Sequence, residues 1–242
     1  MSRPAALVVS GPGTNRDTDA LLALDLAGAE PAVVLAAELA ACPERLDAAR
    51  ILVIAGGFSY GDALGAGRML ALDLVTGDGG RLGECLRAFV AGGRPVVGIC
   101  NGFQVLTRTG LLPGALGHNA GGHFDCRWVA LAPEPGSHCI WTNRLDAEVH
   151  APIAHGEGRY VHPDPDALAT AGQVALRYTG LNPNGSAADI AGVCDATGVV
   201  LGLMPHPENH VIPRQHPRHR HDPGTVRFLG LRLFEAAVRH VK

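Results

Sequence analysis

Five short apolar runs, continuous rather than alternating with polar residues, determine the kind of fold open to this 242-residue chain. Runs rich in Val, Ile, Leu and Ala predict strands that are buried on both faces. The runs are Ala6–Ser10, Ala32–Leu35, Ile51–Ala55, Pro95–Ile99 and Val199–Met204. Helical patterns lie between them, among them Asp17–Ala27 and Arg81–Val90. This alternation predicts an α/β fold: an open, mostly parallel sheet with helices on both faces.

The rest of the chain extends this plan. Residues 127–178 are richer in short strands and turns, which predicts a small antiparallel extension of the main sheet. The apolar spacing of Thr225–Val241 predicts a C-terminal helix. Because the chain holds no internal repeat and no clear linker, residues 1–242 are predicted to form a single domain.

Composition excludes several classes of function. A net charge of −3 and a pI near 6.4 lack the basic footprint of a nucleic-acid-binding protein. No apolar run approaches the roughly 18 to 20 residues needed to cross a bilayer, and the N-terminal residues do not resemble a signal peptide. We therefore expect a cytoplasmic protein. The six cysteines form no CxxC pair and no zinc-ligand spacing, so we expect neither disulfides nor a metal site.

Cys100 stands where an apolar strand ends and a helix is predicted to run to Thr109, with Gly98 and Gly102 two residues to either side. This spacing reproduces the G-x-S-x-G nucleophile elbow, with sulfur in place of oxygen. A sharp strand-to-helix turn would push the side chain out at the carboxyl edge of the sheet, where the helix N-terminus favours a thiolate. A buried cysteine that merely ends a core strand is the alternative. We favour a nucleophile.

A cysteine nucleophile needs a base, and the base needs a group that orients it. His206 follows the strand Val199–Met204, so it is expected at the same edge of the sheet as Cys100. Prolines stiffen the turn on both sides of His206, and Glu208 can hold its imidazole in one tautomer. His155 is a second candidate base, which we interpret instead as a structural or substrate-side residue.

Acyl transfer also needs backbone N–H groups directed at the developing oxyanion. Gly57 follows another strand and can expose its N–H without a Cβ in the way. The amide of Asn101, directly after the nucleophile, is the natural second donor. The sequence thus predicts an oxyanion hole formed by Gly57 and Asn101.

Together these motifs resemble the class I, or triad-type, glutamine amidotransferases. More closely, they resemble the glutaminase subunits that serve phosphoribosylformylglycinamidine synthase in de novo purine synthesis. The matching strings run nearly from end to end: Gly11–Asp17, Gly56–Asp62, Gly98–Gln104, Gly110–Gly114, Pro152–Tyr160, Asn182–Ser186 and Met204–Glu208. The Cys elbow and the His-Pro-Glu string are general to the class, whereas three others are specific to the purine group. Those three are Phe-Ser-Tyr-Gly-Asp, His-Gly-Glu-Gly-Arg and Asn-Pro-Asn-Gly-Ser.

The resemblance implies a flavodoxin-like sheet and a set of roles. It implies that Cys100 attacks the glutamine carboxamide, that His206 carries the proton to the leaving ammonia, and that Glu208 orients His206. Glutamine binding is implied for four positions: Gly56, Gln104, Gly156 and Glu157.

The resemblance also implies partners. Ammonia would pass to a large synthetase subunit that uses ATP and Mg to convert formylglycinamide ribonucleotide to the amidine, and a small accessory subunit would complete the complex. No cofactor is expected in this chain itself.

Alternatives and departures remain. The alternatives are a glutaminase of another biosynthetic pathway, a cysteine hydrolase or peptidase on a similar sheet, and a non-catalytic scaffold subunit. Gly65 stands where the bacterial pattern usually has Arg, although Arg68 is near. The His- and Arg-rich stretch 213–221 lacks helical His spacing and carboxylates, so we interpret it as a solvated loop rather than a metal site.

Overall fold

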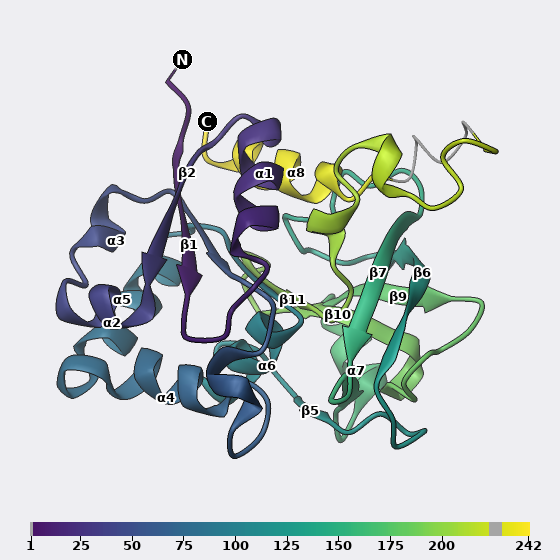
Figure 1. The fold of residues 1–242 in the computed structure, drawn as a ribbon, viewed down its shortest axis with the longest axis horizontal. Helices are drawn as coiled ribbons and strands as arrows, with labels where there is room; N and C mark the ends of the chain where they lie inside the picture. The colour runs from purple at the N-terminus through teal and green to yellow at the C-terminus, as the bar shows by residue number, and fades with distance from the viewer. Residues whose placement is uncertain (1, 223–228) are drawn as a thin grey trace.

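A nine-stranded sheet crosses the molecule in the order β2-β1-β3-β4-β11-β10-β9-β6-β7 (Figure 1). The computed structural model describes residues 2–222 and 229–242. The parallel half consists of β2 (Glu30–Leu35), β1 (Ala5–Ser10), β3 (Ile51–Ile54), β4 (Val96–Ile99) and β11 (Val200–Leu203). The antiparallel half consists of β10 (Ile190–Cys194), β9 (Val174–Thr179), β6 (Asp125–Pro133) and β7 (Val149–His155). The parallel order is that of flavodoxin-like sheets.

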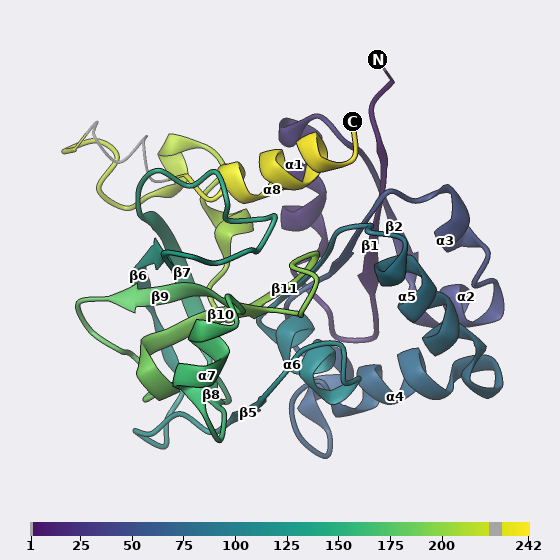
Figure 2. The ribbon, with the colours of Figure 1, turned by 180° about the vertical axis from the view of Figure 1, so that it is seen from behind.

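Helices cover both faces of the sheet, as the views from opposite sides show (Figures 1 and 2). α1 packs against α8, whereas α4 packs against α5 and α6. The α-helices are α1 (Asp17–Ala27), α2 (Ala36–Ala41), α3 (Arg45–Ala48), α4 (Arg68–Thr76), α5 (Arg81–Ala91), α6 (Asn101–Arg108), α7 (Pro165–Thr170) and α8 (Leu231–His240). Within the described ranges, every helix is too short or too polar to cross a lipid bilayer.

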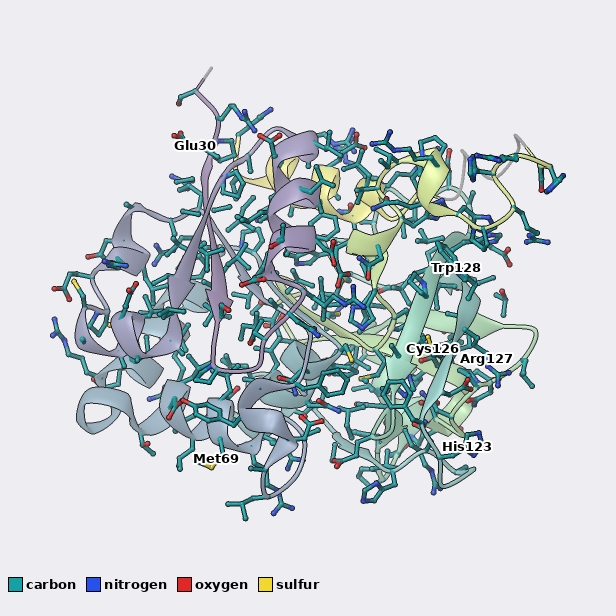
Figure 3. All side chains as sticks on the ribbon, viewed as in Figure 1. Glu30, Met69, His123, Cys126, Arg127 and Trp128 are labelled. Carbon is teal, nitrogen blue, oxygen red and sulfur yellow. The ribbon has the colours of Figure 1, made fainter. Side chains whose placement is uncertain are left out.

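Shorter elements join these layers. β5 (Ala115–Gly117) and β8 (Arg159–Val161) form a separate two-stranded antiparallel sheet. The 3₁₀ turns are η1 (Ser59–Asp62), η2 (Gly77–Gly80), η3 (Ala187–Asp189), η4 (Pro207–Asn209) and η5 (Pro213–Gln215). Figure 3 shows Cys126, Arg127 and Trp128 along β6, on the opposite side of the view from Glu30 and Met69.

The α/β fold and the antiparallel extension are confirmed, with two qualifications. All five apolar runs form parallel strands, and β3, β4 and β11 are buried throughout. β2 is an edge strand whose side chains are largely exposed, so the prediction that it is buried on both faces is wrong. The predicted helix Thr225–Val241 is α8 from Leu231 onward, while its residues 225–228 lie outside the described part of the chain.

Candidate active site

Three buried strands of the parallel half end side by side. β4 pairs in register with β3 on one side and with β11 on the other. Because the carboxyl ends of neighbouring parallel strands meet at one edge of a sheet, the segments that follow them emerge together. These segments carry Gly57, Cys100 and His206.

Cys100 has an unusual backbone conformation between β4 and α6. Its φ of 52° and ψ of −102° lie outside the regions that L-residues favour. A Cβ on Gly98 would collide with the backbone of Gly102, and a Cβ on Gly102 would collide with the carbonyl oxygen of Ile54. The two glycines are therefore a steric requirement of the turn that presents Cys100.

His206 lies beside this turn and is held from two directions. Its backbone N–H donates to Pro152 O of β7 at 2.8 Å, and its ring Nδ1 lies 2.6 Å from Glu208 Oε1. Both side chains are buried, with Glu208 fully shielded from solvent. Gly56, a predicted glutamine-binding residue, leaves space for this ring, since a Cβ on Gly56 would lie 2.8 Å from His206 Cε1. The structure thus places Gly56 against the imidazole.

The electrostatics favour a charged imidazole. Burial opposes the charge, but the Glu208 carboxylate and the Cys100 sulfur outweigh it and raise the pKa of His206 to about 10. The same Cβ on Gly56 would lie 3.2 Å from the backbone oxygen of Ile99, so the imidazole lies beside the end of β4, directly before Cys100. A cationic imidazole beside a thiol stabilises the thiolate, which is the nucleophilic form of cysteine.

The two predicted oxyanion donors flank the elbow. Gly57 adopts a φ of 128° and forms an isolated antiparallel bridge with Thr14. Asn101 is the first residue of α6, where a backbone N–H has no acceptor within its own helix. The side chain of Asn101 is fixed by Ser59 Oγ, which donates to its Oδ1 at 2.6 Å, and by its own donation to Gln104 Oε1 at 3.0 Å.

A cavity of about 220 Å³ opens beside Cys100. Five of the residues predicted for the site line it: Gly57, Cys100, Gln104, Gly156 and Glu157. The other four, Gly56, Asn101, His206 and Glu208, are not part of its lining.

One side of the cavity is acidic. Gln104 Nε2 donates to the backbone oxygen of Glu157 at 2.7 Å, and Arg108 Nη2 lies 4.0 Å from Glu157 Oε2. Asp62 also lines the cavity, and burial together with the charge of Glu157 raises the pKa of its carboxyl group. Asp62 was not among the predicted site residues, although it ends the motif Gly56–Asp62. That motif was the signal in the sequence that could have identified Asp62 as a site residue.

Asn119 was missed altogether, although it holds the segment that carries Gly156 and Glu157. Its backbone N–H donates to Gly156 O at 2.9 Å, and its side chain bonds both ends of the segment His155–Gly158. Its partners lie about 36 residues further along the chain, so no local pattern in the sequence marks it.

The described residues contain no group of three or more His, Cys, Asp or Glu side chains placed to hold a metal ion. In the His-rich stretch, the buried ring of His216 instead packs against Trp128 on β6 and against His210.

The comparison with known proteins agrees with this geometry. A family model described as a CobB/CobQ-like glutamine amidotransferase domain matches residues 3–241. The chain is 44% identical to phosphoribosylformylglycinamidine synthase subunit PurQ of Treponema denticola, covering 99% of both proteins. It is 39% identical to the subunit of the same name from Dehalococcoides mccartyi, covering 99% of this chain and 98% of that one.

Solved structures extend the likeness. A chain in the structure of PurLQS from Thermotoga maritima aligns with a TM-score of 0.81 and 36% identity, over 99% of this chain and all of that one. A glutamine amidotransferase from the same organism aligns with a TM-score of 0.60 at 13% identity, which shows the fold alone. The chain belongs to the CobB/CobQ-like glutamine amidotransferase family, and within it to the group of PurQ subunits.

Proposed function

We propose that this chain is the glutaminase subunit of a phosphoribosylformylglycinamidine synthase and that it hydrolyses L-glutamine through a thioester on Cys100. One observation carries the proposal: Cys100 stands on a strained elbow in a cavity wall, next to an imidazole that a buried carboxylate holds. This is the nucleophile, base and orienting group of a triad, supplied by residues far apart in the sequence.

In the first half of the reaction, the Cys100 thiolate attacks the carboxamide carbon of glutamine. Negative charge develops on the carboxamide oxygen, and the backbone amides of Gly57 and Asn101 are the donors that stabilise it. The imidazolium of His206 gives its proton to the departing nitrogen, which leaves as ammonia while a γ-glutamyl thioester remains on Cys100.

In the second half, water attacks the thioester. His206, now neutral, accepts a proton from that water, and Glu208 keeps the ring in position throughout because it bonds Nδ1. Collapse of the second tetrahedral intermediate breaks the carbon–sulfur bond and releases glutamate. The thiolate–imidazolium pair is then restored.

Glutamine binding would use the acidic wall. The α-ammonium group of a free amino acid is a cation, and Asp62 and Glu157 place two carboxyl groups in the cavity lining. Gln104 fixes the backbone of Glu157, and Gly156 continues the same wall. These contacts would select free glutamine over a glutamine side chain within a protein.

The ammonia is used elsewhere. The PurLQS structure from Thermotoga maritima contains a chain similar to this one, which supports a complex with a large synthetase subunit and a small accessory subunit. In the complex that we propose for this chain, the synthetase subunit would use ATP and Mg to convert formylglycinamide ribonucleotide to the amidine. This chain needs no cofactor of its own for the steps above.

Two further assignments, of domain organisation and of location, accompany the proposal. Residues 1–242 act as one glutamine amidotransferase domain, which the continuous nine-stranded sheet supports. The protein works in the cytoplasm, in keeping with the purine pathway it would serve.

The test is a substitution of the nucleophile in the assembled complex. Cys100→Ala is expected to abolish amidine synthesis from glutamine and to leave synthesis from added ammonia intact, because only the first route passes through the thiol. Cys126→Ala, which removes an exposed cysteine on β6, is the matched control and should keep both activities. Equal loss of both activities in Cys100→Ala, or survival of both, would contradict the proposal.

A further inference from the structure

His155 is a buried titratable residue for which the mechanism above has no use. It ends β7, only 3% of it is exposed, and it belongs to the lining of the same cavity as Cys100. The residue before it, Ala154, places its carbonyl oxygen 3.9 Å from Cys100 Sγ. His155 therefore stands near the reacting end of the cavity.

The hydrogen bonds of Asn119 determine which ring nitrogen of His155 carries the proton. Asn119 Nδ2 donates to two carbonyl oxygens, those of His123 at 3.0 Å and His155 at 2.8 Å. Its Oδ1 accepts from the N–H of Gly158 at 3.0 Å, so the orientation of the amide is fixed. Oδ1 also lies 3.0 Å from His155 Nδ1. Because an amide oxygen can only accept, Nδ1 must be the protonated nitrogen.

The ring is also neutral. Burial, and after it the charge on His206, lowers the pKa of His155 to about 4. A neutral imidazole with its proton on Nδ1 presents a lone pair on Nε2. That atom is buried and has no hydrogen-bonding partner among the residues that the structure describes. A buried acceptor without a donor destabilises the fold. Such an acceptor is expected where a bound ligand supplies the missing donor.

We propose that His155 Nε2 accepts a hydrogen bond from the carboxamide N–H of bound glutamine and so positions the amide for attack by Cys100. The inference rests on the proposed function and adds a specificity to it. Glutamate, the product, carries no N–H at this end and would turn a carboxylate oxygen toward the lone pair. A site built around a hydrogen-bond acceptor discriminates strongly against a ligand that lacks the donor, so His155 would favour release of the product.

The test compares two ligands in the assembled complex. His155→Ala is expected to lower kcat/KM for glutamine by about 10- to 100-fold, because the substrate loses a buried hydrogen bond. The second ligand is 6-diazo-5-oxo-L-norleucine, a glutamine analogue that carries a diazoketone in place of the carboxamide and has no amide N–H. Its covalent labelling of Cys100, followed by mass spectrometry, is expected to proceed at the wild-type rate in His155→Ala.

Two further variants sharpen the result. His155→Gln, which can bring an amide oxygen close to the position of Nε2, is expected to recover part of the lost kcat/KM. His216→Ala removes another buried imidazole, outside the cavity lining, and should leave both reactions unchanged.

The outcomes separate the inference from the proposed function. If His155→Ala slows diazoketone labelling as much as glutamine turnover, His155 is only structural and the inference fails, as it also does if glutamine turnover is unaffected. If the analogue does not label Cys100 in the wild-type protein, the proposed function itself fails and the inference falls with it.

Discussion

The charge on His206 depends on its buried neighbours. An isolated buried histidine would be neutral, because burial disfavours the charged ring. Here the Glu208 carboxylate and the Cys100 sulfur reverse that preference and raise the pKa of His206 to about 10. The enzyme therefore starts with its general acid already protonated near neutral pH.

Glu208→Gln tests this balance. Removing the carboxylate is expected to lower the pKa of His206, which NMR titration of the imidazole measures directly. A folded-state pKa above the ordinary 6.5 means that the charged ring stabilises the fold fully below about pH 6.5 and that this contribution is lost as the pH rises toward 10. The stability advantage of the wild type over the variant, from urea denaturation, should therefore shrink across that interval.

The matched control is Glu148→Gln, which removes a carboxylate 3.9 Å from His150 Nε2. It should leave the titration of His206 unchanged. An unchanged His206 pKa in Glu208→Gln would show that the carboxylate does not hold the charge.

At the scale of elements, the elbow depends on close contact between α6 and the strands. Gly102 lies on the first turn of α6 against β3, and its missing side chain lets the helix approach the sheet. The contact is with backbone, which cannot rotate away as a side chain can. The spacing of glycines around Cys100 is thus explained by packing as well as by the turn.

Gly102→Ala is expected to force α6 away from β3. Overpacking at such a site costs about 1–3 kcal/mol, so the free energy of unfolding in urea should fall by that amount. Gly117→Ala is the control, because a Cβ at Gly117 meets no atom within 4 Å and its backbone φ is not in the left-handed region. Equal stability of Gly102→Ala and wild type would refute the steric account.

The same elements show what the sequence could predict. β3, β4 and β11 were predictable because strands buried on both faces are continuously apolar. The edge position of β2 was not, since an apolar run does not say whether another strand pairs beyond it. The partners of β6 and β9 were also out of reach, because antiparallel register is set by tertiary pairing.

Considering the molecule as a whole, segments from both halves of the sheet line the cavity. The parallel half supplies Cys100 and Gly57, and the end of β7 in the antiparallel half supplies His155 and the segment after it. The triad could be predicted because Cys100 and His206 each follow an apolar strand and Glu208 lies two residues after His206. Asn119 could not, since its role depends only on which distant backbone groups it meets.

The most direct test of the proposed chemistry is to look for the thioester. Intact-mass and peptide mass spectrometry of the complex, quenched in acid during the first turnover of glutamine, should find a γ-glutamyl group on Cys100. The Cys100→Ala complex should carry none. Release of glutamate at the normal rate with Cys100 unmodified at every quench time, or a γ-glutamyl group on another residue, would contradict the account.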